Sequence, residues 1–131
     1  MSNTTIREAC RKGMQLEGAD ATMRPHTALS ILAVDAHETA TSKGWWDGER
    51  RPAELIALIH SELSECLEAL RHGNPPSEHL ADFSAVEEEM ADVVIRVLDM
   101  CAGYGYSIGP AVQAKMEYNK TRPRKHGGKE F

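Results

Sequence analysis

The sequence lacks any apolar run that approaches the roughly 20 residues a membrane-spanning helix requires. Its first residues, MSNTTIREACRKG, contain no apolar core of the kind found in signal peptides. No segment alternates polar and apolar residues with a period of two over a useful length, so we predict no sheet. These absences favour a cytoplasmic, helical protein with no membrane partner, and its 131 residues suit one domain.

Cysteines and positive charge are also scarce. The three cysteines, Cys10, Cys66 and Cys101, form no CxxC pair, which favours reduced, buried thiols in a cytosolic protein. A formal net charge of −5 argues against a protein that coats a nucleic acid polymer. The basic residues are concentrated between Lys115 and Lys129, where six Lys or Arg accompany a single acid. The acids, in contrast, crowd into the middle of the chain.

Apolar residues recur with helical spacing in four segments, which predicts an all-α four-helix bundle. The first helix is expected over residues 28–43. Pro52 suits the first turn of the second, which should end near Arg71. Ser84 and Glu87 form a capping-box pair before the third, and Ser107 is the expected N-cap of the fourth. We divide the chain into an N-terminal extension (1–27), a helical domain (28–123) and a basic tail (124–131).

Two glutamates stand where the second helix would be expected to carry apolar residues. Glu62 projects into the middle of the apolar face, Glu65 lies at its edge, and Glu68 falls on the solvated side. The apolar face itself comprises Leu55, Leu58, Ile59, Cys66, Ala69 and Leu70. Because an unpaired buried carboxylate is costly, the position of Glu62 calls for a partner.

The third helix repeats this pattern, with Glu89 and Asp92 three residues apart along the border of its apolar face. Two such pairs directed toward one core would repel each other unless cations intervene. Carboxylate oxygens with no matching His or Cys suit a hard cation such as Mg²⁺. The sequence therefore suggests a magnesium site formed by Glu62, Glu65, Glu89 and Asp92.

A surface pair or a salt bridge is the usual explanation of a single Glu-x-x-Glu, because Glu is a common helix former. Glu65 and Glu89 fit that explanation, whereas Glu62 does not. By helical spacing, Arg96 is expected to pair with Glu89 and Asp99, and Asp99 is expected to support the ligands from behind. The spacing alone leaves both interpretations open.

Three segments in order, SELSE (61–65), EMAD (89–92) and KMEYNKTRP (115–123), resemble the MazG-type all-α nucleoside triphosphate pyrophosphohydrolases. The region from His37 to Trp46 is similar to the dCTP pyrophosphatase branch of that family. No GxxxxGK[ST] loop is present, which excludes a P-loop enzyme. The resemblance covers about residues 28–123 and implies hydrolysis of a nucleoside or deoxynucleoside triphosphate to the monophosphate and pyrophosphate. It also implies a homodimer or homotetramer with sites near the subunit contacts.

The resemblance assigns roles to individual residues. The four acids would hold Mg²⁺, with Mn²⁺ as a possible substitute. Trp46 and His37 would meet the base, while Trp45 would pack. Contacts to the phosphates or sugar would come from Lys115, Asn119 and Arg122. Ser61 stands where many members have another Glu, which leaves open the group that activates the attacking water.

Two other functions remain in view. One is a non-catalytic metal- or nucleotide-binding helical bundle, such as a di-iron carboxylate protein. Di-iron bundles carry Glu-x-x-His pairs, and no His stands three residues after Glu62, Glu65 or Glu89, which disfavours this interpretation. The other is an interaction protein whose basic tail binds nucleic acid, which a short tail on an acidic domain disfavours.

Overall fold

The computed structural model describes residues 25–128, and these residues form helices and connecting segments. The helices are α2 (Pro25–Ser42), α3 (Pro52–Arg71), α4 (Ala85–Gly103), α5 (Ile108–Lys120) and the four-residue α6 (Lys125–Gly128). Within this range the extended pairing is limited to one isolated bridge between Pro76 and Ser84. The predicted all-α class is therefore confirmed. None of the helices in this range is long and apolar enough to cross a membrane.

Local sequence signals set most helix ends where they were predicted. Pro52 occupies the first turn of α3, and the capping box of α4 is formed by Ser84 and Glu87. The first helix begins at Pro25, three residues before the predicted start. Ser107 is the N-cap residue of α5, as predicted, although its side chain makes no capping hydrogen bond.

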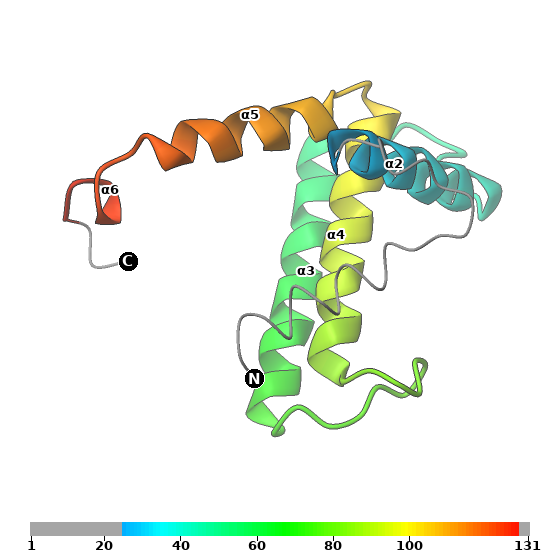
Figure 1. The fold of residues 1–131 in the computed structure, drawn as a ribbon. Coiled ribbons are helices and arrows are strands. Elements are labelled where there is room, and N and C mark those ends of the chain that lie inside the picture. Colours follow the sequence, from blue (N-terminus) through cyan, green and yellow to red (C-terminus); the bar gives the residue numbers. More distant parts are fainter. Residues whose placement is uncertain (1–24, 129–131) are drawn as a thin grey trace, which may run out of the picture.

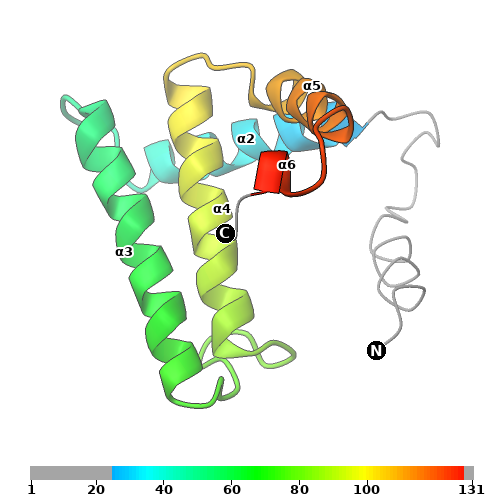
Figure 2. The ribbon, with the colours of Figure 1, turned by 90° about the vertical axis from the view of Figure 1, so that its left-hand side faces the viewer.

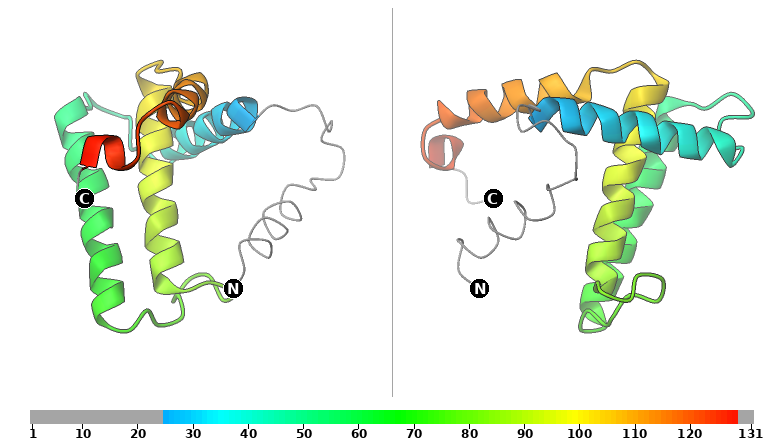
Figure 3. Two further views of the ribbon diagram at one scale, coloured as in Figure 1. Left: turned by 60° about the vertical axis from the view of Figure 1, so that its left-hand side comes forward. Right: turned by 45° about the vertical axis from the view of Figure 1, so that its right-hand side comes forward.

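Helices α3 and α4 run antiparallel, side by side, and form a long hairpin (Figures 1 and 2). Helix α2 crosses α4 near the end of the hairpin where α3 begins and α4 ends, and it also packs against α5. Helix α5 then runs away from the hairpin (Figure 3). The helices therefore make an open arrangement in which α5 lies outside the hairpin, whereas a bundle was expected to enclose all four.

The buried core of the described residues is small. Its apolar members are Ala33, Leu55, Cys66, Leu98 and Cys101. The two core cysteines are free thiols, as predicted, and burial raises the pKa of Cys101; Cys10 lies outside the described residues. Large apolar side chains stay exposed on every long helix, for example Leu32 on α2, Leu67 on α3, Val94 on α4 and Met116 on α5.

Trp46 attaches the α2–α3 loop to the end of α4. Its indole Nε1 donates a hydrogen bond to Asp99 Oδ1 over 2.9 Å, and its ring meets those of His37 and Tyr104 edge to face. His37 Nδ1 lies 2.8 Å from the same Asp99 oxygen. The Tyr104 hydroxyl donates to the carbonyl of Arg50, further along the loop. Asp99 therefore joins α2, the loop and α4 at one point, and this junction positions the rest of the loop.

Candidate metal centre

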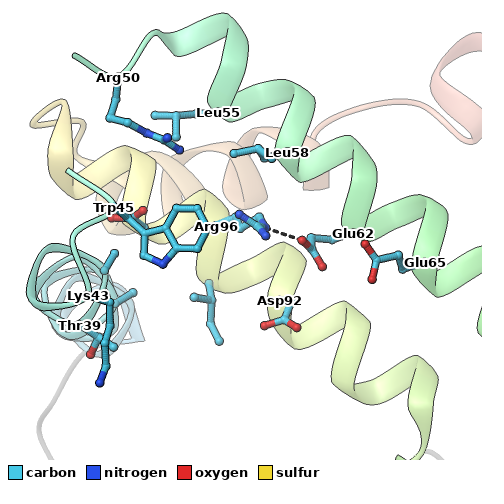
Figure 4. Close-up of a pocket in the computed structure, with 14 residues that line it drawn as sticks. Thr39, Lys43, Trp45, Arg50, Leu55, Leu58, Glu62, Glu65, Asp92 and Arg96 are labelled. Carbon is cyan, nitrogen blue, oxygen red and sulfur yellow. Dashed lines mark hydrogen bonds and ion pairs between the residues drawn. The ribbon is translucent and has the colours of Figure 1, made fainter. Parts of the chain in front are cut away.

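Glu62 on α3 meets Glu89 and Asp92 on α4 across the hairpin. Each offers a carboxylate oxygen, and the three oxygens lie within 4.8 Å of one another. Glu62 is 5% exposed and is the only buried charged residue in the described part of the chain. The antiparallel register of two helices with the same i, i+3 acid spacing brings these groups together. Figure 4 shows Glu62 between the two helices, and Asp92 on α4 near it.

Glu65, the fourth predicted ligand, lies beside this group without belonging to it. Its side chain is exposed, lines the same cavity, and is close enough to Glu89 to raise the pKa of that carboxyl. The structure thus brings three of the predicted ligands into one cluster and places the fourth at its edge. Direct metal binding by Glu65 stays a prediction.

The cluster is electrostatically unfavourable as it stands. The pKa of Glu89 is raised mainly by burial, and the neighbouring charges of Glu65, Glu62 and Asp92 raise it further. The pKa of Asp92 is also raised, by burial and then by Glu62, with Arg96 opposing the shift. Neither Glu89 nor Asp92 has an ion-pair partner among residues 25–128. A hard divalent cation would relieve this repulsion, and the donor set, oxygens alone, fits Mg²⁺ or Mn²⁺.

Arg96 reaches across to the deepest of these acids. Its Nε donates to Glu62 Oε1 over 2.5 Å, so the expected pairing of Arg96 with Glu89 and Asp99 is wrong. The interhelical register decides this partner, and helical spacing within α4 gives no information about it. One carboxylate of the cluster is therefore already neutralised by the protein, while the other two are not.

A cavity of about 460 Å³ extends from the acids toward the α2–α3 loop, and its volume is in the range of small-ligand pockets. In Figure 4, Glu62, Glu65 and Asp92 lie at one end. Arg96 lies in the middle of the cavity. Lys43, Trp45 and Arg50 lie at its other end. The cavity therefore has acidic side chains at one end and basic and aromatic side chains at the other.

The cavity is lined by Trp45 and not by Trp46, whereas the resemblance implied that Trp46 meets a base and Trp45 packs. Trp45 is 55% exposed and lines the cavity, with the Arg50 guanidinium 5.9 Å from its ring centroid. Trp46 instead packs against Gly103, held by Asp99, and does not line the cavity. His37 is bonded to the same carboxylate and also lies outside the lining. Contact of His37 and Trp46 with a base stays a prediction.

The three residues predicted for the phosphates or sugar lie on or just after α5, apart from the cavity. Lys115 places its ammonium 4.7 Å from the ring centroid of Tyr118, and Asn119 is exposed. Arg122 follows the end of α5. None of the three lines the cavity, and α5 runs away from the hairpin that carries the acids (Figure 3).

Lys43 and Arg50 line the cavity although the sequence gave no role to either of them. Trp45 also lines it, whereas the resemblance implied that this residue packs. They lie at or after the end of α2, where helical periodicity stops and the loop conformation decides which side chains face inward. Asp99 follows Asp92 by seven residues and so was expected behind the metal ligands, but its Oδ1 accepts from Trp46 Nε1 and lies next to His37 Nδ1.

Glu89→Gln is expected to raise the melting temperature of the metal-free protein at neutral pH. A raised folded-state pKa means that this carboxylate destabilises the fold above that pKa, and that the effect vanishes below the ordinary value of 4.5. The difference between variant and wild type should therefore shrink on acidification from neutral pH to about pH 4. Calorimetric melts with and without Mg²⁺ measure it, and Mg²⁺ should stabilise the wild type more than the variant.

Glu87→Gln is the matched contrast two residues away. Hydrogen bonds from Ser84 lower the pKa of Glu87, so its ionised form supports the folded state and its loss should lower the melting temperature. A metal-free Glu89→Gln variant that melts below the wild type at neutral pH would contradict the proposed repulsion.

Comparisons of this chain with protein-family models, with curated proteins and with solved structures gave no match.

Proposed function

We propose that the protein is a Mg²⁺-dependent pyrophosphohydrolase that cleaves a nucleoside or deoxynucleoside triphosphate to the monophosphate and pyrophosphate. The observation that supports this most directly is the convergence of Glu62, Glu89 and Asp92, within 4.8 Å, beside a cavity of nucleotide-compatible size. The motif resemblance to MazG-type enzymes, in which these positions hold the metal, supports the same function. Removal of surplus or noncanonical nucleotides is the expected role.

Mg²⁺ or Mn²⁺ bound by the three carboxylates would neutralise the triphosphate and lower the pKa of an attacking water. Glu65 lies beside the cluster and outside its 4.8 Å group, which suits it to accept the proton of that water. The exposed ring of Trp45 at the far end of the cavity offers a flat face on which a base can stack. The substrate would then lie along the cavity, with its phosphates at the acidic end.

We further propose that the active form is a homodimer or homotetramer. Large apolar side chains are exposed on all four long helices, including Met116 at 59%, which is more than a stable isolated domain usually leaves uncovered. Association would also allow Lys115, Asn119 and Arg122 to act at the cavity of a second copy, since they do not line their own. Light scattering should give a mass above that of one chain at micromolar concentration, and a monomer there would contradict the proposal.

A substrate panel tests the activity. Purified protein is incubated with each common NTP and dNTP and Mg²⁺, and the products are separated chromatographically. Release of monophosphate and pyrophosphate, abolished by EDTA, is the expected result. Absence of turnover with every nucleotide, in both Mg²⁺ and Mn²⁺, would refute the proposed function.

A non-catalytic metal- or nucleotide-binding bundle is the second candidate. The ion pair between Arg96 and Glu62 favours its nucleotide-binding form, because part of the acidic cluster is neutralised without the metal that catalysis would require. This candidate predicts that the protein binds Mn²⁺ or a nucleotide and returns the nucleotide unchanged. The same panel, analysed for binding as well as for products, separates the two functions.

A further inference from the structure

Arg96 lies at the boundary between the acidic cluster and the rest of the cavity. It belongs to α4, one turn beyond Asp92, and its side chain is 33% exposed while that of Glu62 is 7% exposed. Figure 4 shows its guanidinium group directed at Glu62, with the ends of the cavity on either side. The contact therefore joins a cavity-lining cation to the deepest carboxylate of the proposed metal site.

Most of the hydrogen-bonding capacity of this guanidinium is unused. Arginine carries five N–H donors, and within residues 25–128 one of them, Nε–H, has an acceptor. Because the side chain is partly exposed beside the cavity, its other donors are available to a ligand.

Arg96 and a divalent ion would compete for the negative charge of Glu62. Its Oε1 accepts from Arg96, and its carboxylate also belongs to the group that could hold the ion. A metal ion bound to that group would stand close to the guanidinium, and the two positive charges would repel each other. Metal binding should therefore weaken the contact between Arg96 and Glu62.

We infer that Arg96 is a phosphate-binding residue. In the metal-free protein its guanidinium is bound to Glu62. When a metal ion binds Glu62, the guanidinium is released and binds the metal-associated triphosphate. This inference rests on the proposed function. A guanidinium group matches phosphate oxygens with paired, charge-assisted hydrogen bonds. Of the cations that line the cavity, Arg96 is the one next to the acids, whereas Lys43 and Arg50 lie at the far end (Figure 4).

The test measures binding of Mn²⁺ alone, by its electron paramagnetic resonance signal, and then binding of the preformed Mn²⁺–tripolyphosphate complex. Inorganic tripolyphosphate makes the assay independent of the unknown base. Arg96→Gln removes the competitor for Glu62, so it should bind Mn²⁺ alone several-fold more tightly than the wild type. It should bind the tripolyphosphate complex about 10- to 100-fold more weakly, the usual effect of losing hydrogen bonds to a charged group.

Arg71→Gln is the control, because Arg71 also pairs with a glutamate of α3, Glu68 at 3.2 Å, but on the exposed side of the helix. It should leave both affinities unchanged. A purely structural Arg96 would instead hold Glu62 in place, and its loss would weaken both affinities together. That result, or an unchanged affinity for the tripolyphosphate complex, overturns the inference.

Arg96→Lys keeps the charge but loses the paired donors, and it tests the inference if Arg96→Gln fails to fold. It should bind Mn²⁺ as the wild type does and the tripolyphosphate complex more weakly; equal affinity for the complex would overturn the inference. The proposed function fails separately. If the wild type binds no Mn²⁺ and hydrolyses no nucleotide, both proposals fall, whereas an active wild type with a fully competent Arg96→Lys variant sinks the role of Arg96 alone.

Discussion

Replacing Glu62 by Gln should reduce nucleotide turnover by about 10³-fold or more, because a neutral amide is a poor substitute for a carboxylate that holds a catalytic metal ion. Glu62 is the most buried member of the cluster and the point where α3 contributes to it. The amide keeps the shape of the side chain, so the loss should appear in kcat while the helical circular dichroism spectrum is preserved. Steady-state kinetics with the best substrate of the panel measure the effect.

The structure adds a stability cost to this substitution. Glu62→Gln converts an ion pair with Arg96 into a weaker hydrogen bond, which should lower the free energy of unfolding by about 1–3 kcal/mol. Arg96 is partly exposed and can be rehydrated, so the variant should still fold. Glu68→Gln, on the solvated side of the same helix, is the matched control and should keep its activity. Comparable losses in both variants, or a Glu62→Gln protein whose turnover stays within tenfold of the wild type, would contradict the proposed metal role of Glu62.

The acidic cluster could be predicted because it depends on local rules. Helical periodicity places Glu62 on the inner face of α3 and Asp92 at the border of the inner face of α4. The connection over residues 72–84 reverses the chain, so that the two helices pack antiparallel. The capping box of Ser84 and Glu87 fixes where α4 begins. These features involve residues close in sequence or the simplest packing of neighbouring helices.

The partner of Arg96 and the direction of α5 could not be obtained in this way. Both depend on how elements distant in sequence are placed, and Arg96 can reach either its own helix or the neighbouring one from the same helical position. Periodicity along α5 indicates which side of the helix is apolar, but α5 contacts α2 and points away from the hairpin. The expected contact of Lys115 with the phosphates or sugar therefore rests on the family resemblance alone. In the described part of the chain, Lys115 does not line the cavity that contains the acidic cluster.

The sequence also could not indicate which of two adjacent loop residues, Trp45 or Trp46, faces the cavity. In a helix or strand the backbone decides which of two neighbours faces inward, but a loop imposes no such rule. Here Gly103 decides, because its lack of a side chain leaves room for the indole of Trp46, and Asp99 accepts the indole hydrogen bond. Trp45 is then turned toward the cavity.

Replacing Gly103 by Ala should destabilise the protein by about 2–3 kcal/mol and lower its melting temperature by roughly 10 °C. A Cβ atom at this position would lie 2.5 Å from Cζ2 of Trp46 and closer still to Cη2, well inside van der Waals contact. The indole cannot easily move aside, because Asp99 holds its Nε1 and the rings of His37 and Tyr104 flank it. Calorimetric or chemical unfolding measures the loss.

Gly48, in the same loop, provides the control, since a Cβ there would meet nothing within 4 Å and its backbone is not in the left-handed region. Gly48→Ala should be neutral or slightly stabilising, because alanine restricts the unfolded chain. If Gly103→Ala folds, displacement of Trp46 should also shift Trp45 and Arg50, which would raise KM for the nucleotide more than it lowers kcat. A Gly103→Ala protein as stable as Gly48→Ala would show that Trp46 does not hold the loop, and that the basic end of the cavity is set by something other than this junction.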